Sequence, residues 1–192
     1  MAFGISEFKS NLTGGGARSS LFNVNLNFPS ALSVVGSDKY KFLISASSIP
    51  ASTLTTYDIF YHGKALKVAS DRTFDAWETT IINDENFAIR KNLERWINLV
   101  SKPDLNTRDI DIVGTSAVNE GTNADYKTDL NVTQYSKNGK SLQTYYFRGA
   151  FPTSISSIPL SWESSAIETY TCNWAYDHWD RKDVLGGDET DE

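Results

Sequence analysis

The chain has 192 residues and a net charge of −6, with 40% hydrophobic and 22% charged residues. This composition is typical of a folded domain of ordinary size, and it excludes a disordered chain and a strongly basic nucleic-acid-binding protein. One cysteine excludes an internal disulfide, and no apolar run approaches the roughly 20 residues that a membrane-spanning helix needs.

The charge is unevenly distributed along the chain. Residues 183–192 hold five acids and no base, so the residues before them carry a net charge of −1. We interpret 181–192 as an acidic tail, either solvated or in contact with a basic partner surface. Residues 1–20 contain a glycine run and no basic segment followed by an apolar one, so we expect a flexible arm and no secretion signal.

The first predicted strands alternate apolar and polar residues. Phe22, Val24, Leu26 and Phe28 alternate with three asparagines, which predicts a strand with one buried face. A second strand is predicted over 39–46, and a loop follows at 48–51. Residues 55–61 and 64–69 are predicted to pair as a hairpin across a His-Gly turn.

The segment 70–100 predicts a strand that is followed by the one convincing amphipathic helix. β-Branched and aromatic residues predict the strand over 73–82, and Asn83 and Asp84 then offer side-chain oxygens as helix caps. From Glu85 the period changes to that of a helix over 85–100, with an apolar stripe that includes Leu93 and Trp96.

The remaining segments complete a mainly β fold. Residues 101–125 are polar and longer than a usual connection, so we expect an exposed insertion. A Lys-Asn-Gly-Lys turn predicts a hairpin of 126–135 with 141–148, and two further strands are predicted over 155–162 and 166–179. The sum is a single domain over 21–180, an antiparallel β-sandwich or half-open barrel with one flanking α-helix.

Residues with catalytic or metal-binding chemistry are few and poorly spaced. His62, His178 and Cys172 do not have the spacing of a zinc site, and the alternation around Cys172 favours a buried thiol over a nucleophile paired with His178. Acids such as Asp71 and Asp75 could form a carboxylate pair, but Arg72 beside them favours a structural role. We therefore expect no enzymatic activity, no metal and no cofactor.

Two segments carry a resemblance to a known family. Residues 71–85 read D-R-T-F-D-x-W followed by N-D-E, and 149–179 contain G-x-F-P-T, L-x-W-E-S and Y-D-x-W. In this order, and with an intervening helix, they resemble the tail tube proteins of contractile-tailed bacteriophages. The signature residues are Asp71, Arg72, Phe74, Asp75, Trp77, Asn83, Asp84, Glu85, Trp162 and Trp179.

The resemblance implies a structural virion protein of the tail, assembled in the host cytoplasm. It implies hexameric rings that stack into an inner tube, with the strands of all copies joined into one barrel around a lumen. Its partners would be other copies, the tail sheath protein, the baseplate tube-initiator and tape-measure proteins, and viral DNA that passes without specific binding. Within it, we expect ring or stacking contacts from Ile49, Pro50, Tyr57, Ile59 and Tyr61.

The sequence leaves two alternatives open. The same type of ring occurs in tube-initiating baseplate proteins and in type VI secretion rings. From another class, a carbohydrate-binding β-sandwich would also account for the strands and for an aromatic content of 12%.

Overall fold

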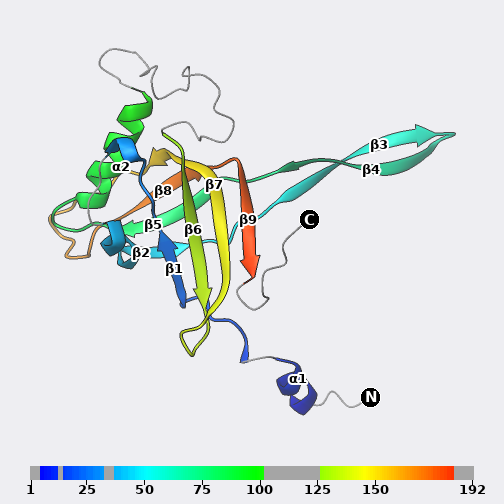
Figure 1. Cartoon of the computed structure of the whole chain (residues 1–192), viewed down its shortest axis with the longest axis horizontal. Coiled ribbons are helices and arrows are strands. Elements are labelled where there is room, and N and C mark those ends of the chain that lie inside the picture. The colour runs from blue at the N-terminus through cyan, green and yellow to red at the C-terminus, as the bar shows by residue number, and fades with distance from the viewer. Residues whose placement is uncertain (1–4, 13–14, 33–36, 102–125, 184–192) are drawn as a thin grey trace.

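The computed structural model describes residues 5–12, 15–32, 37–101 and 126–183. Figure 1 shows a β-rich body with helix α2 packed on one side, and a long two-stranded hairpin that projects away from the body. The helices are α1 (Ile5–Asn11), α2 (Ala88–Val100) and the 3-10 helices η2 (Ser30–Leu32) and η3 (Ser37–Phe42). The strands are β1 (Phe22–Asn25), β2 (Ile44–Ser47), β3 (Thr53–Tyr61), β4 (Lys64–Thr73), β5 (Trp77–Ile82), β6 (Thr128–Tyr135), β7 (Ser141–Ile155), β8 (Thr169–Ala175) and β9 (His178–Asp183).

The body is built from two antiparallel sheets that share the long strand β7. The first part of β7 lies between β6 and β9, and β1 pairs with the far side of β6. The last part of β7 pairs with β8, and the sheet continues through β5 to β2. The predicted mainly β, antiparallel fold with one main helix is therefore confirmed.

Buried aromatic side chains fill the space between the sheets and α2. Trp77 stacks on Phe147 with ring centroids 4.1 Å apart, and Trp96 of α2 meets the edge of Trp174 at 5.7 Å. Each indole N–H in this core has an acceptor: Trp77 donates to the Ser48 carbonyl, Trp96 to the Tyr126 carbonyl and Trp174 to the Thr79 hydroxyl. The three buried indole rings thus keep their polar atoms paired. The hydroxyl of Tyr170, which is also buried in this core, has no hydrogen-bond partner among the described residues.

At Gly149, strand β7 passes from one sheet to the other, and its backbone lies close to the turn between β8 and β9. We call this place the corner. Gly149 lies within β7 at a φ of +63°, and a Cβ at this position would overlap the carboxylate of Asp177. Asp177 belongs to the turn between β8 and β9, and its own N–H donates to the Arg148 carbonyl at 2.9 Å. Glycine is therefore favoured here by its backbone conformation, and a side chain at this position would displace the Asp177 carboxylate.

Helix α2 begins at Ala88, three residues after the predicted start at Glu85. Phe87 has a φ of 55°, and the Asp84 carboxylate accepts a hydrogen bond from the Ala88 N–H at 3.0 Å. The predicted cap at Asp84 is thus formed from four residues away, because a turn separates it from the helix. Leu93 and Trp96 are buried, as the apolar stripe predicts.

Several strand predictions differ from the structure. Residues 26–28 lie beyond the end of β1, and within the predicted strand 73–82 residues 74–76 carry no strand and separate β4 from β5. Residues 39–42 form part of η3 rather than a strand, since Tyr40 is buried against Phe28 from a helical turn. Residues 156–162 carry no strand, and β7 instead ends at Ile155. The predicted strand 166–179 begins at Thr169 and is divided by the β8–β9 turn, so that β8 and β9 lie in different sheets.

The proposed ends of the domain are only partly described. Within the N-terminal arm 1–20, residues Ile5–Asn11 form α1, and within the acidic tail 181–192 the first residues continue β9 to Asp183. The predicted insertion 101–125, apart from Ser101, and the remainder of the tail lie outside the described residues. No helix in the described part of the chain is long and apolar enough to cross a membrane.

Candidate assembly surfaces

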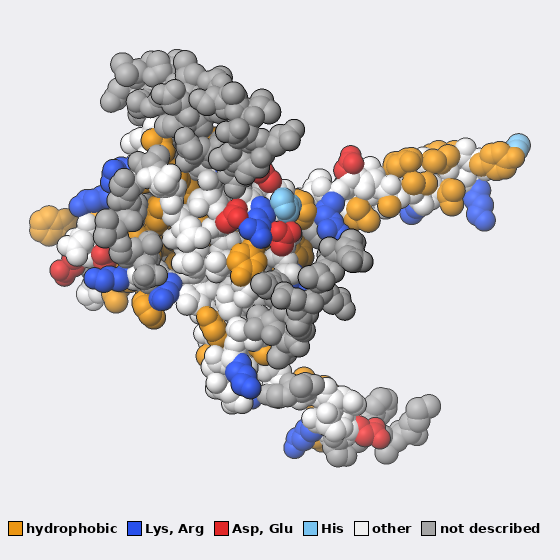
Figure 2. Space-filling view, in the orientation of Figure 1, with side chains coloured by type: hydrophobic (Ala, Val, Ile, Leu, Met, Phe, Trp, Pro, Cys, Tyr) orange, Lys and Arg blue, Asp and Glu red, His pale blue; other side chains and the backbone are white. Residues whose placement is uncertain are grey.

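The hairpin β3–β4 is an isolated two-stranded sheet with an apolar face. Its strands pair with each other and with no other described strand, and every residue of β3 is exposed. In antiparallel pairing the residues opposite one another share a face, and the register pairs Tyr57 with Val68 and Ile59 with Leu66. Figure 2 shows apolar side chains along this projection.

An exposed hairpin of this kind needs a partner. A two-stranded sheet is at best marginally stable in water, and a contiguous apolar surface normally marks an interaction site. Phe60 and Tyr61 at the end of β3 are 72% and 75% exposed. The hairpin is therefore a candidate surface for contact with another protein chain.

The sheet of β1, β6, β7 and β9 offers a second candidate surface at its two edges. Strand β1 pairs with β6 on one side, and β9 pairs with β7 on one side; neither has another strand partner in the described part of the chain. Unpaired strand edges carry N–H and C=O groups that can bind a further strand. This sheet is thus open at both ends.

A group of ion pairs fixes β9 and the corner to this sheet. The Arg148 guanidinium binds Asp129 of β6 at 2.6 Å and Asp180 of β9 at 2.8 Å, and Lys127 binds Asp177 at 2.8 Å. The hydrogen bonds that Arg148 donates to the carboxylates of Asp180 and Asp129 raise its pKa. Arg148 therefore stays charged and joins three neighbouring strands across the polar face of the sheet.

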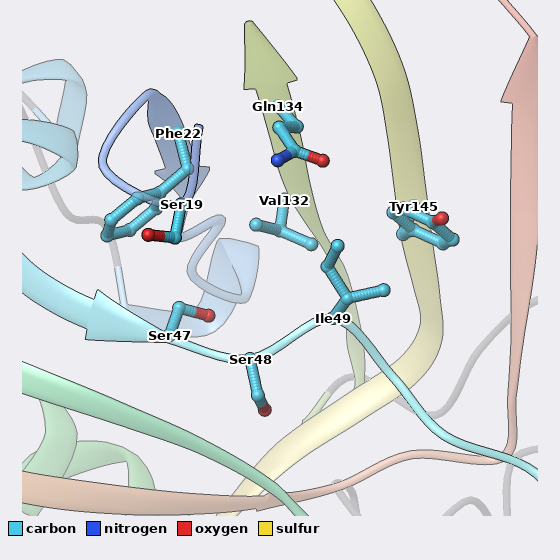
Figure 3. Close-up of a pocket in the computed structure, with 8 residues that line it drawn as sticks. All are labelled: Ser19, Phe22, Ser47, Ser48, Ile49, Val132, Gln134 and Tyr145. Carbon is cyan, nitrogen blue, oxygen red and sulfur yellow. The ribbon is translucent and has the colours of Figure 1, made fainter. Parts of the chain in front are cut away.

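A small pocket separates the edge at β1 from the segment after β2. It has a volume of about 280 Å³ and is lined by Ser19, Phe22, Ser47, Ser48, Ile49, Val132, Gln134 and Tyr145. Figure 3 shows Ile49 pointing into this space towards Val132 of β6 and Tyr145 of β7, whereas Ser48 points away. Ile49 is half exposed here and thus forms part of an incompletely filled apolar surface.

The residues predicted to form the interface occupy two separate places. Tyr57, Ile59 and Tyr61 share the apolar face of the hairpin. Ile49 lines the pocket on the body, and Pro50 follows it in the chain. The sequence prediction did not include Leu66 and Val68, although the hairpin register places them on the same face. The alternation of apolar and polar residues along β4 was the signal that could have identified them.

The signature residues do not form one site. Asp71 and Arg72 are exposed near the end of β4, Trp77 is in the core, and Phe74 packs near Tyr176. Asn83 donates to Glu168 at 2.7 Å, and Trp179 donates to the Ala51 carbonyl at 3.2 Å. The remaining ones, Asp75, Asp84, Glu85 and Trp162, lie in turns and loops around the body.

The candidate catalytic residues are separated in the structure. Cys172 is fully buried, and burial raises the pKa of its thiol to about 12. His178 is instead exposed on β9. In the described residues, no group of three or more His, Cys, Asp or Glu side chains could hold a metal ion.

Comparison with known proteins identifies a family that the chain matches over most of its length. Residues 17–182 match the family described as phage tail tube protein. The tail tube protein gp19 of Enterobacteria phage T4 is 26% identical over 170 residues, covering 88% of this chain and 93% of the T4 protein. The corresponding protein of Enterobacteria phage T6 is 25% identical over the same length.

Solved structures share the fold. A chain of the anti-feeding prophage baseplate superimposes with a TM-score of 0.62 at 12% identity, covering 88% of this chain and 97% of that chain.

The resemblance to tail tube proteins seen in the sequence is confirmed, and the family match supports it over the alternatives of a secretion ring or a carbohydrate-binding sandwich. The chain belongs to the phage tail tube protein family and is a structural component of the phage tail.

Proposed function

We propose that six copies of this chain close into a ring and that such rings stack into the inner tube of a contractile tail. The observation that carries this proposal is the sheet β1-β6-β7-β9, which is open at both edges. Closure of identical sheets into a ring removes such edges and satisfies their backbone groups. The related chain of the anti-feeding prophage comes from an assembly described as 6-fold symmetrised, which supports the same number of copies.

Strand direction supports closure through these two edges. Each neighbouring pair in the sheet is antiparallel, so β1 and β9 run in opposite directions. When β9 of one copy lies beside β1 of the next, the alternation of directions continues without interruption. The ring would then be one uniform antiparallel barrel, which is the better-tolerated pairing for a sheet with one face in water.

The dimensions of this barrel admit duplex DNA. Six copies contribute about 24 strands, which at about 4.8 Å spacing and about 40° tilt give a circumference on the order of 150 Å. The backbone diameter is about 48 Å, or about 35–40 Å once side chains are included. Duplex DNA, roughly 20 Å across, passes through such a lumen.

The face of the sheet opposite the core suits a conduit. Val24, Leu130 and Val132 point to the core, so their strand neighbours Asn23, Asn25, Asn131 and Thr133 lie on the other face. We assign this polar face to the lumen. Amides and hydroxyls hold phosphates weakly compared with Lys or Arg, and the charge of Arg148 is compensated by two carboxylates, so DNA would slide without specific binding.

The other contacts follow from the same arrangement. We assign ring or stacking contacts to the hairpin face with Tyr57, Ile59 and Tyr61 and to the corner at Ile49 and Pro50. The outer surface of the tube would support the sheath, with the acidic tail 181–192 in contact with it, and the tube ends would meet the baseplate tube-initiator and tape-measure proteins. The role of the chain is structural, without catalysis or a cofactor.

Imaging of the purified protein tests the proposal. We expect negative-stain electron micrographs to contain rings and stacked rings, with tubes lengthening as the protein concentration rises. Analytical ultracentrifugation would detect the same assembly as a heavy, concentration-dependent species. A protein that stays monomeric at high concentration, and that adds to no preformed tube, would contradict the proposal.

A further inference from the structure

The end of the body farthest from the hairpin carries a second exposed surface, formed by two loops. These are 83–87, between β5 and α2, and 156–168, between β7 and β8, and Figure 1 shows both at the end of the long axis opposite the hairpin. The Asn83 N–H donates to the Glu168 carbonyl at 2.9 Å, and the Asn83 side chain donates to the Glu168 carboxylate at 2.7 Å. These bonds hold the two loops side by side, and we call their shared surface the distal patch.

The distal patch exposes large apolar side chains. Trp162 is fully exposed, and Leu160 and Ile167 are 81% and 75% exposed. The chain has five tryptophans, and the other four are buried or half-buried in the body. A tryptophan in water beside two exposed aliphatic residues is the composition of an interaction hot spot rather than of an ordinary surface.

The distal patch is also acidic. Asp84, Glu85, Glu163 and Glu168 lie on its two loops, and Glu85 and Glu163 have no ion-pair partner among the described residues. Two bases at the start of α2 border these loops, and only Arg90 is paired with an acid, so the four acids outnumber the remaining base. Arg90 binds Glu94 and lies over the Tyr170 ring, and Lys91 donates to the Asn86 carbonyl. The distal patch therefore presents an excess of negative charge.

The hairpin has the complementary properties. Its apolar face matches the apolar residues of the distal patch, and its outer end carries Lys64 and Lys67 with one acid, Asp58. Lys67 binds Asp58 at 3.1 Å, whereas Lys64 has no ion-pair partner in the described part of the chain. The hairpin end is thus apolar and basic, and the distal patch is apolar and acidic.

We propose that the hairpin of one copy docks on the distal patch of the next copy. This inference rests on the proposed assembly and names the surface that receives the hairpin. Because the two surfaces lie at opposite ends of the long axis, one copy cannot satisfy its own. The contact joins two different surfaces, so it repeats from copy to copy and does not stop at a symmetric dimer. The nine residues of β3 give a reach of about 30 Å, enough to enter a neighbouring copy.

Two single-site variants test this contact. Ile59→Asp places a charge on the hairpin face, and Trp162→Asp places a charge on the distal patch; both side chains are exposed in the single copy, so both variants should fold. We expect neither variant to form tubes alone. Asn138→Asp, on the exposed β6–β7 turn away from both surfaces, is the matched control and should form tubes like the wild type. Circular dichroism and thermal unfolding verify the fold of each variant.

A mixture of the two variants gives the decisive result. The Ile59→Asp copy keeps an intact distal patch, and the Trp162→Asp copy keeps an intact hairpin. In a mixture, the intact hairpin of one variant can dock on the intact distal patch of the other, but the contact cannot repeat. Sedimentation velocity should therefore detect pairs of the particles that each variant forms alone. These pairs should dissociate more readily at high salt, because the contact includes charge attraction.

The remaining outcomes separate a failure of the docking inference from a failure of the proposed function. Tubes formed by Trp162→Asp, or a mixture without paired particles, would overturn the docking inference while leaving the tube function intact. A wild-type protein that does not assemble would instead overturn the proposed function itself.

Discussion

Phe147 and Trp77 stack face to face across the two sheets of the body, with ring centroids 4.1 Å apart and 20° between the ring planes. Phe147 lies on the part of β7 that pairs with β6 and β9, and Trp77 lies on β5 in the other sheet. The same Phe147 ring also meets the edge of Tyr176 at 5.0 Å. This stack is the point at which the sheet proposed to form the barrel is fixed to the rest of the body.

Replacing Phe147 by alanine should destabilise the protein strongly. The substitution removes a fully buried ring and leaves a cavity beside Trp77, so we expect a loss of about 3–5 kcal/mol in the free energy of unfolding. Phe147→Leu keeps most of the volume and should lose less than half of that. Urea unfolding followed by tryptophan fluorescence measures both, and equal losses would show that aromatic stacking rather than volume dominates.

Gly149 and Gly139 provide a matched pair for the corner of β7. Both have positive φ, but Gly139 has open space around it, whereas a side chain at 149 meets Asp177. We expect Gly139→Ala to cost about 1–2 kcal/mol from backbone strain alone. Gly149→Ala should cost more, about 2–5 kcal/mol, because the added Cβ also displaces the Asp177 carboxylate that binds Lys127. Thermal unfolding of the two variants compares them, and equal midpoints would contradict the close approach at the corner.

Charge on the apolar face of the hairpin should block assembly without unfolding the body. Tyr57→Asp places a carboxylate beside Val68 on that face, so we expect tubes to be lost in negative-stain images. Thr56→Asp introduces the same charge on the opposite face of the same strand, and this variant should still assemble. Loss of tubes in both variants would mean that the interface is not confined to the face proposed here.

Stability should fall at alkaline pH because of the buried thiol. Burial raises the pKa of Cys172 from its usual value near 9 to about 12, so the unfolded chain releases this proton first as the pH rises. The contribution is complete below pH 9 and is lost between about pH 9 and 12, with a slope of up to about 1.4 kcal/mol per pH unit. Burial also raises the pKa of Tyr170, which adds to the loss above pH 10.

Urea unfolding at pH 7, 9 and 10 measures this effect. Cys172→Ala removes the thiol, so its stability should decline less steeply with pH than that of the wild type, although it starts lower because of the small cavity. In the folded wild type at pH 8, a thiol reagent should react with Cys172 only as fast as the protein unfolds. Rapid labelling of the native protein would contradict the buried position.

The sequence predicted correctly those elements that are determined by residues close together in the chain. The turn at His62 and Gly63 and the turn that contains Gly139 predicted both hairpins, because the positive φ of these three residues restricts the residue types that fit there. Alternation around Cys172 likewise predicted its burial, which the structure confirms. The apolar stripe of α2 marked the face that packs on the core.

The remaining features depend on contacts that the sequence pattern does not encode. β7 continues through Gly149 and Pro152 to Ile155, although glycine and proline usually end a strand, because two different sheets hold its two parts. Arg148 binds acids that lie 19 and 32 residues away, and no local pattern connects them. Apolar residues at 158–162 suggested a strand, but Leu160 and Trp162 are exposed in a loop.

The hairpin lies in the chain between β2 and β5, which are hydrogen-bonded neighbours in the body. It is therefore a detachable extension: residues 53–73 could be lengthened, shortened or replaced by a tight turn while the strands at its base stay where they are. Each residue added to both strands would extend the arm by about 3.3 Å. The spacing between linked copies thus becomes a property that can be adjusted in small steps, separately from the architecture of the body.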